Sequence, residues 1–258
     1  ESGGGTLKVY NWGEYIDEDV ITQFEDETGI SVVYDVFETN EEMYPVVEAG
    51  GVKYDVVCPS DYMIQRMIDN NMLAELDYDN IPNAKQIGDD YWNMSKDFDP
   101  KNQYAVPYCW GTVGILYNKQ MLADAGYEEP PKTWDELKEM SQDMMDKGIC
   151  KYGIAWGASQ AEGLICDLTT MIYSFGGTWQ KEDGSFDINS ESANNAVQFM
   201  YDSMQDGWAD PASITYTDRD CLDPFMAGDT AFVMNWAYVY GYANNPENST
   251  VAGNVDVC

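Results

Sequence analysis

The sequence contains no histidine among its 258 residues. This absence excludes Ser-His-Asp and Cys-His nucleophiles, histidine acid–base chemistry and most catalytic zinc sites. Residues 157–161 (GASQA) come near the pattern of a nucleophile elbow, but the final glycine is missing and no histidine could activate Ser159. We therefore expect a protein that is not an enzyme, and a hydrolase remains only as a disfavoured alternative.

Basic residues are scarce. Thirteen Lys+Arg stand against 46 Asp+Glu, which gives a formal net charge of -33. Without a basic patch the chain cannot displace counterions from phosphates, so we expect no nucleic acid as a partner. The charge favours solubility and long-range attraction of cations. A general acidic bias of the source proteome would have the same effect, so the charge is weak evidence about a ligand.

Closely spaced cysteines and long apolar runs are also missing. The six cysteines form no C-x-x-C pair, so we expect no metal cluster, no cofactor and no dense disulfide scaffold. No apolar run approaches the roughly 18 residues of a membrane span. Residues 1–5 (ESGGG) have the composition of a flexible tether. They would fit the remainder of a processed export signal, although an expression scar would look the same.

What is present is a globular composition, with 44% hydrophobic and 14% aromatic residues. The first part of the chain alternates between strand-like and helix-like patterns. We expect strands at 6–12, 30–36 and 54–59, and helices at 17–28, 40–49 and from residue 61. This alternation predicts an α/β fold with a parallel sheet covered on both faces. Residues 77–104 are expected to be irregular and at the surface.

A second unit is expected to begin at residue 112. It should contain strands at 113–118 and 152–155, helices from Thr133, near 160–175 and at 190–205, a hairpin around 183–184, and the segment 225–236. The predicted organisation is a tether (1–5), lobe 1 (6–111) and lobe 2 (112–258). Each lobe should be a mostly parallel sheet flanked by helices.

Three loops that follow predicted strands carry aromatic residues beside polar ones, at 12–15, 60–62 and 108–112. Such loops are where ligands bind in α/β sheets, and a pocket needs apolar walls with a few polar groups. The candidates in these loops are Trp12, Gly13, Glu14, Tyr15, Ser60, Asp61, Tyr62 and Trp110. The first four could form a box for a small cation. The alternatives are a packed strand end for the first loop, helix capping for the second, and hinge packing for Trp110.

The second unit offers further candidates, which are Trp156, Glu162, Asp167, Trp179 and Trp236. Glu162 and Asp167 are five residues apart, so they lie on different sides of one helix and at most one should face a cleft. Asp167 is the better candidate for burial. Glu162, nearer the helix start, is better placed to reach a ligand, although either could be solvated.

Several motifs occur in one order over about 110 residues: 7–15 (LKVYNWGEY), 24–30 (FEDETGI), 38–44 (ETNEEMY), 54–62 (YDVVCPSDY) and 106–111 (VPYCWG). Together they resemble the spermidine/putrescine-binding proteins of bacterial ABC importers. The resemblance implies a two-lobed, type II periplasmic-binding-protein (venus-flytrap) fold that clamps a linear polyamine between rings and carboxylates. By position, Trp12 and Tyr15 resemble ring walls, Gly13 and Glu14 loop contacts, Ser60 and Tyr62 the second loop, and Trp236 a second-lobe wall.

The resemblance is mixed beyond residue 117. Residues 118–119, 125–126, 130–137 (PPKTWDEL) and 176–179 (GGTW) resemble the sugar-binding branch of the same superfamily. The acidic pair of the polyamine branch has no clean counterpart, and Glu162 is the nearest residue. The resemblance also implies a segment that returns to lobe 1 and carries a Trp, an Asp and a Tyr of the amine site. We expect this segment to be missing by C-terminal truncation.

The resemblance implies a solute-binding component of an ABC importer, with a small-molecule ligand and a membrane permease as partners. We expect an exported monomer, periplasmic or tethered as a lipoprotein at the cell surface, that binds a polyamine in the cleft between its lobes. The alternative ligand is an oligosaccharide stacked on Trp110, Trp179 and Trp236.

Overall fold

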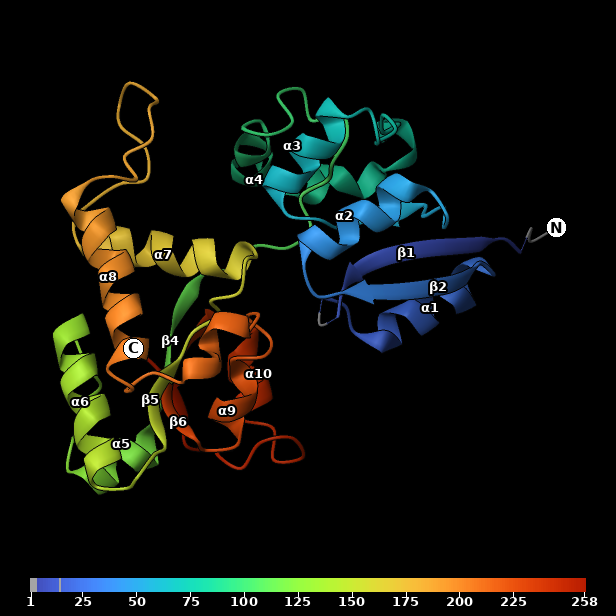
Figure 1. Cartoon of the computed structure of the whole chain (residues 1–258). Helices are drawn as coiled ribbons and strands as arrows, with labels where there is room; N and C mark the ends of the chain where they lie inside the picture. Colours follow the sequence, from blue (N-terminus) through green and yellow to red (C-terminus); the bar gives the residue numbers. More distant parts are fainter. Residues whose placement is uncertain (1–3, 14) are drawn as a thin grey trace. The chain divides into compact units, whose positions relative to one another are not determined.

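The computed structural model describes residues 4–13 and 15–258 (Figure 1). It divides into two compact units, the first ending at Trp110 and the second spanning Gly111–Cys258. The sequence places this boundary one residue later. Glu14 and residues 1–3 of the expected tether lie outside the described residues.

The sheet of the first unit contains β1 (Thr6–Trp12), β2 (Ser31–Phe37) and β3 (Val56–Val57) in the order β2-β1-β3. Both pairings are parallel, and the register places Trp12 beside Phe37 at the ends of β1 and β2. The expected parallel sheet is therefore confirmed in this unit. The third strand is shorter than expected, and Pro59, which follows it, has no N–H to extend the ladder.

Three helices follow these strands: α1 (Glu18–Thr28), α2 (Asn40–Ala49) and α3 (Asp61–Asp69). The Thr39 hydroxyl caps α2 by accepting a hydrogen bond from the Glu42 N–H, at 3.2 Å. The core of the unit lies between the sheet and helices α2 and α3, and consists of Tyr10, Phe37, Met43, Tyr44, Met63 and Met67. The prediction that helices cover both faces of the sheet is therefore confirmed for the face that packs against α2 and α3. Helix α1 buries no residue against the sheet.

The segment after α3 is more ordered than its composition indicates. It contains η1 (Tyr78–Asn80), η2 (Pro82–Gln86) and α4 (Asp89–Ser95), where the sequence predicts irregular structure. Asp99 is 2% exposed, and its Oδ2 accepts a hydrogen bond from the Tyr104 N–H at 2.7 Å. These short helices are missed because they depend on such local bonds rather than on an apolar period.

The sheet of the second unit contains β4 (Val113–Asn118), β5 (Tyr152–Ala155), β6 (Thr230–Trp236) and β7 (Val255–Val257) in the order β5-β6-β4-β7. Strands β5 and β6 are parallel, but β4 is antiparallel to both β6 and β7. The expectation of a mostly parallel sheet is therefore wrong for this unit. Buried strands are apolar in either orientation, so their pattern does not encode direction.

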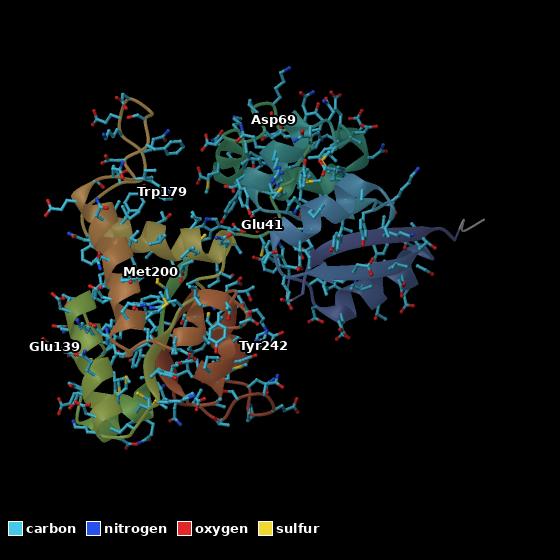
Figure 2. All side chains as sticks on the ribbon, viewed as in Figure 1. Glu41, Asp69, Glu139, Trp179, Met200 and Tyr242 are labelled. Carbon is cyan, nitrogen blue, oxygen red and sulfur yellow. The ribbon has the colours of Figure 1, made fainter. Side chains whose placement is uncertain are left out.

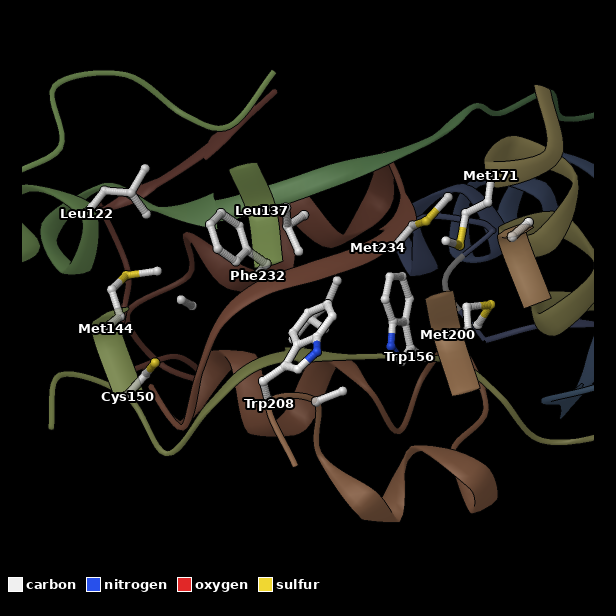
Figure 3. Close-up of a cluster of buried hydrophobic side chains, with 14 of the residues drawn as sticks. Leu122, Leu137, Met144, Cys150, Trp156, Met171, Met200, Trp208, Phe232 and Met234 are labelled. Atoms are coloured by element: carbon white, nitrogen blue, oxygen red, sulfur yellow. The ribbon is translucent and has the colours of Figure 1, made fainter. Parts of the chain in front are cut away.

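The helices of the second unit are α5 (Lys119–Ala125), α6 (Trp134–Asp146), α7 (Glu162–Ser174), α8 (Glu191–Gln205), η3 (Pro211–Thr215), α9 (Leu222–Met226) and α10 (Tyr238–Ala243). The predicted helices from Thr133, near 160–175 and at 190–205 are confirmed. The predicted hairpin is reduced to one bridge between Gln180 and Phe186. Figure 3 shows the main core of this unit, in which Trp156, Trp208 and Phe232 are the largest side chains. Within the described part of the chain, no helix has the length and apolarity needed to span a membrane.

Candidate ligand-binding site

The carboxyl ends of β1, β2 and β3 meet at one edge of the first sheet, where the Trp12 loop begins. The half-buried ring of Trp12 lies 4.6 Å from the Phe37 ring and 5.9 Å from the Tyr15 ring, measured between centroids. Trp12 and Tyr15 are tilted by 35° to each other. The structure thus brings these two predicted residues together as neighbouring rings, and Phe37 packs against the Trp12 ring. Gly13 between them is exposed.

Two tyrosines hold the backbone of this loop. The Tyr34 hydroxyl donates to the Trp12 carbonyl oxygen at 3.5 Å, and the Tyr108 hydroxyl donates to the Tyr15 carbonyl oxygen. Burial is the main cause that raises the pKa of both phenols, so both remain protonated donors at neutral pH. Sequence reasoning missed Tyr34. The available signal was an aromatic residue inside a β-branched strand.

The loops after β2 and β3 are tied together through Asn40 and Ser60. The Asn40 Nδ2 donates to the Ser60 Oγ at 3.0 Å, and the Ser60 N–H donates to the Asn40 Oδ1 at 3.1 Å. Ser60 precedes α3, but its hydroxyl caps no N–H of that helix. The predicted capping role is therefore wrong for this side chain. Asn40 is fully buried, and sequence reasoning did not identify it as the partner of Ser60.

Tyr62 is 41% exposed and binds two carboxylates, one through its ring hydroxyl and one through its backbone N–H. The Tyr62 hydroxyl donates to the Glu41 Oε1 at 2.7 Å, and the Tyr62 N–H donates to the Asp61 Oδ1 at 2.6 Å. Glu41, labelled in Figure 2, lies in the first turn of α2, next to Asn40. An exposed ring with adjacent carboxylates suits an organic ammonium group.

Trp110 is the last residue of the first unit and is 65% exposed. Most of its surface is therefore open to solvent. The alternative of hinge packing would explain only the small part that is buried. Glu14, the remaining predicted contact of the first unit, lies outside the described residues.

In the second unit, Trp236 ends β6 and is half-buried. A Cβ on Gly111 would lie 3.2 Å from the indole Cδ1, so the Gly111 backbone approaches this ring closely. Trp156 belongs to the core, with 0% exposure and its Nε1 donating to the Ser203 Oγ at 2.9 Å. Trp179 also packs, partly buried, against that core.

Helix α7 carries the two acidic candidates on different sides, as their spacing predicts. Glu162 is half-buried at the helix start, whereas Asp167 is 2% exposed. Burial, and next the negative charge of Asp218, raises the pKa of Asp167 well above its ordinary value, while a hydrogen bond from the Gly157 backbone opposes the rise. Asp167 is thus buried too deeply to reach a ligand directly.

Asp218 is an acidic neighbour of α7 that sequence reasoning missed. A Cβ on Gly157 would lie 3.2 Å from the Asp218 backbone nitrogen, so the two backbones touch. The signal in the sequence is a capping box before α9. Thr217 Oγ1 accepts from the Asp220 N–H at 3.2 Å, and Asp220 Oδ2 accepts from the Thr217 N–H at 2.9 Å.

In the described ranges, no group of three or more metal-ligating side chains is placed to hold a metal ion.

Asp167 gives a test of this electrostatic arrangement. Because the folded-state pKa of Asp167 is raised, its favourable contribution to the free energy of unfolding is complete below the unfolded pKa of about 4. This contribution is lost as the pH rises through the folded pKa. Asp167→Asn keeps an acceptor for the Gly157 N–H and removes the charge. We expect a gain in the free energy of unfolding of about 1–3 kcal/mol at pH 7, and little gain near pH 4.

Urea unfolding at both pH values measures this difference. Asp124→Asn is the matched control, because Asp124 is exposed on α5 of the same unit. A loss of stability in Asp167→Asn at pH 7, or an equal effect at both pH values, would contradict the assignment.

Two α/β units, with rings and carboxylates at the carboxyl ends of strands, define a protein of the two-lobed periplasmic-binding-protein class. The chain belongs to the family of bacterial extracellular solute-binding proteins, whose sequence profile matches residues 10–258. The predicted periplasmic-binding-protein fold and the solute-binding family are thereby confirmed, whereas the mostly parallel sheet expected in the second unit is not.

Relatives of both expected kinds are found. The chain is 41% identical over 130 residues to the putrescine-binding periplasmic protein SpuD of Pseudomonas aeruginosa, a match covering 50% of this chain and 35% of that protein. The match thus spans about a third of the length of that relative. Maltose-bound MalE3 of T. maritima superposes with a TM-score of 0.83 at 26% identity, covering 99% of this chain and 67% of that one. The spermidine/putrescine-binding protein PotD of Streptococcus pneumoniae gives 0.70 at 28% identity, covering 98% and 68%.

Proposed function

We propose that this protein is the solute-binding component of an ABC importer and that its ligand is a polyamine such as putrescine. The observation that carries this proposal is the edge of the first sheet, where the Trp12 and Tyr15 rings lie 5.9 Å apart. The Tyr62 ring with its carboxylate neighbours follows β3 at the same edge. Rings attract ammonium groups through their faces, and carboxylates accept charge-assisted hydrogen bonds from them. The relative named for putrescine supports the same ligand class.

The proposed mechanism is capture without chemistry. The ligand contacts rings and carboxylates of the protein, its binding favours one conformation, and the permease recognises that conformation. The protein acts as an exported monomer, in the periplasm or tethered as a lipoprotein at the cell surface. Trp236 supplies the ring of the second lobe and Glu162 its carboxylate.

An oligosaccharide is the second candidate ligand. Trp110 exposes 65% of its surface, and an exposed indole is a good platform for the apolar face of a sugar ring. The maltose-bound relative, with its TM-score of 0.83, supports this alternative.

Calorimetric titration with putrescine, spermidine and maltose separates the two ligands. We expect saturable binding of a polyamine that persists at about 0.15 M salt, where diffuse attraction to the acidic surface is screened. The matched control is 1,4-butanediol, which has the shape of putrescine without its charges and should not bind. Binding of maltose alone would replace the polyamine by a sugar, and no binding of any of them by folded protein would overturn the proposed ligand class.

A further inference from the structure

An asparagine-tryptophan pair ends an internal strand in each unit. Asn11 and Trp12 end β1, which lies between β2 and β3, and Asn235 and Trp236 end β6, which lies between β5 and β4. Both asparagines are buried, with 3% and 1% exposure. Burying an amide costs free energy unless its polar atoms are hydrogen-bonded. The partners of these two side chains therefore indicate their purpose.

Each asparagine binds the backbone of the tryptophan that follows it. The Asn11 Oδ1 accepts a hydrogen bond from the Trp12 N–H at 2.8 Å, and the Asn235 Oδ1 accepts one from the Trp236 N–H, also at 2.8 Å. A local bond of this kind satisfies the tryptophan N–H where the strand ends. It fixes the direction in which the chain, and with it the indole, leaves the sheet.

Asn11 also interacts with two tyrosines that hold the first loop. Its side chain lowers the pKa of the Tyr34 and Tyr108 phenols against the effect of burial. Those hydroxyls donate in turn to the carbonyl oxygens of Trp12 and Tyr15. The Asn11 side chain thus binds the Trp12 N–H and interacts with both tyrosines whose hydroxyls hold the turn that carries the two rings.

The amide nitrogen of Asn235 has a corresponding role in the second unit. It donates to the Asp218 carbonyl oxygen at 2.6 Å and contacts the Cys221 Sγ at 3.4 Å. This bond fixes the turn before α9 to the end of β6. The same turn lies against α7, since a Cβ on Gly163 would be 3.5 Å from the Asp218 Cβ.

We infer that Asn11 and Asn235 are positioning residues that orient Trp12 and Trp236 for the ligand, one in each unit. This inference rests on the proposed function for its ligand but makes a claim about the free protein as well. The inference is based on one bond that occurs in both units. In each unit an asparagine side chain accepts a hydrogen bond, at 2.8 Å, from the backbone N–H of the last residue of an internal strand, although the two sheets differ in topology.

Asn11→Ala and Asn235→Ala test the inference in two ways. Without ligand, the indole N–H signal of the following tryptophan should shift in the NMR spectrum of ¹⁵N-tryptophan-labelled protein. With putrescine, the affinity of each folded variant should fall about tenfold, as expected for the loss of one buried hydrogen bond that orders a contact residue. The first measurement stands even if putrescine is not the ligand.

Asn118→Ala is the matched control. Asn118 is also buried, at 3% exposure, and also ends a strand, but its Oδ1 caps α5 by accepting from the Gln120 and Met121 N–H groups. This variant should lose stability and keep both tryptophan signals and the affinity. If an alanine variant fails to fold, Asn→Leu at the same position removes both the acceptor and the donor while it fills the same space, and the shift should still appear. Unshifted tryptophan signals in the folded variants would overturn the inference whether or not putrescine binds. Unchanged affinity in variants of a protein that does bind putrescine would overturn it as well.

Discussion

Replacing Trp12 by alanine should lower the affinity for putrescine by about 30-fold or more while the chain stays folded. Trp12 is half-buried at the end of β1 and contacts Phe37 and Tyr15 through its ring. The variant loses both a face for the ammonium group and a wall that excludes water, a combined effect of about 2 kcal/mol. Isothermal titration with putrescine measures the change, and circular dichroism confirms the fold.

Two further variants complete this experiment. Trp12→Phe retains an aromatic face and should keep most of the affinity. Trp92→Ala makes the same change in the same unit, at a half-buried residue of α4 that packs against Tyr78, and should leave affinity unchanged. If Trp12→Ala binds as well as the wild type, Trp12 serves only to pack on Phe37.

Replacing Gly153 by alanine should destabilise the second unit by about 3 kcal/mol. Gly153 lies in β5, and a Cβ there would be 2.1 Å from the Cβ and 3.1 Å from the Cα of Ser141 on α6. Ser141 is fully buried, so it has no free space into which to move. The added methyl group must push α6 away from the sheet. The midpoint of urea unfolding, followed by tryptophan fluorescence, measures the loss.

A second substitution identifies the cause. Ser141→Gly removes the clashing Cβ, so the double variant Ser141→Gly/Gly153→Ala should be more stable than Gly153→Ala alone by about 1–2 kcal/mol. Gly114→Ala is the matched control in the same sheet, since its Cβ would meet only the Val257 side chain at 3.8 Å. It should change stability by less than about 1 kcal/mol. Equal losses in Gly114→Ala and Gly153→Ala would contradict the account.

Much of the fold follows from local pattern. The strands Thr6–Trp12, Val113–Asn118 and Tyr152–Ala155 have the predicted bounds because each is an apolar or β-branched run with a clear end. The start of α6 follows from Thr133, whose hydroxyl accepts from the Glu136 N–H. The direction of β4 relative to β6 could not be predicted, because buried strands carry no signal for orientation.

The candidate site is predictable to a lesser degree. Trp12 and Tyr15 lie close together because they share one loop after one strand. The partners that order the site come from distant segments: Tyr34 is 22 residues from the Trp12 carbonyl that it binds, and Tyr108 is 93 residues from that of Tyr15. Such contacts depend on strand register and tertiary packing, which a single sequence does not specify. The ligand contacts themselves remain predictions.

The most direct test of the central claim is a putrescine titration followed through the indole N–H signals of the eight tryptophans, assigned by single Trp→Phe variants. We expect the signals of Trp12 and Trp236 to shift together and to saturate at the same putrescine concentration. The signals of Trp156 and Trp208, which are 0% and 2% exposed in the core of the second unit, should stay in place. A titration that leaves Trp12 and Trp236 unshifted would contradict the proposal that these two residues contact a polyamine.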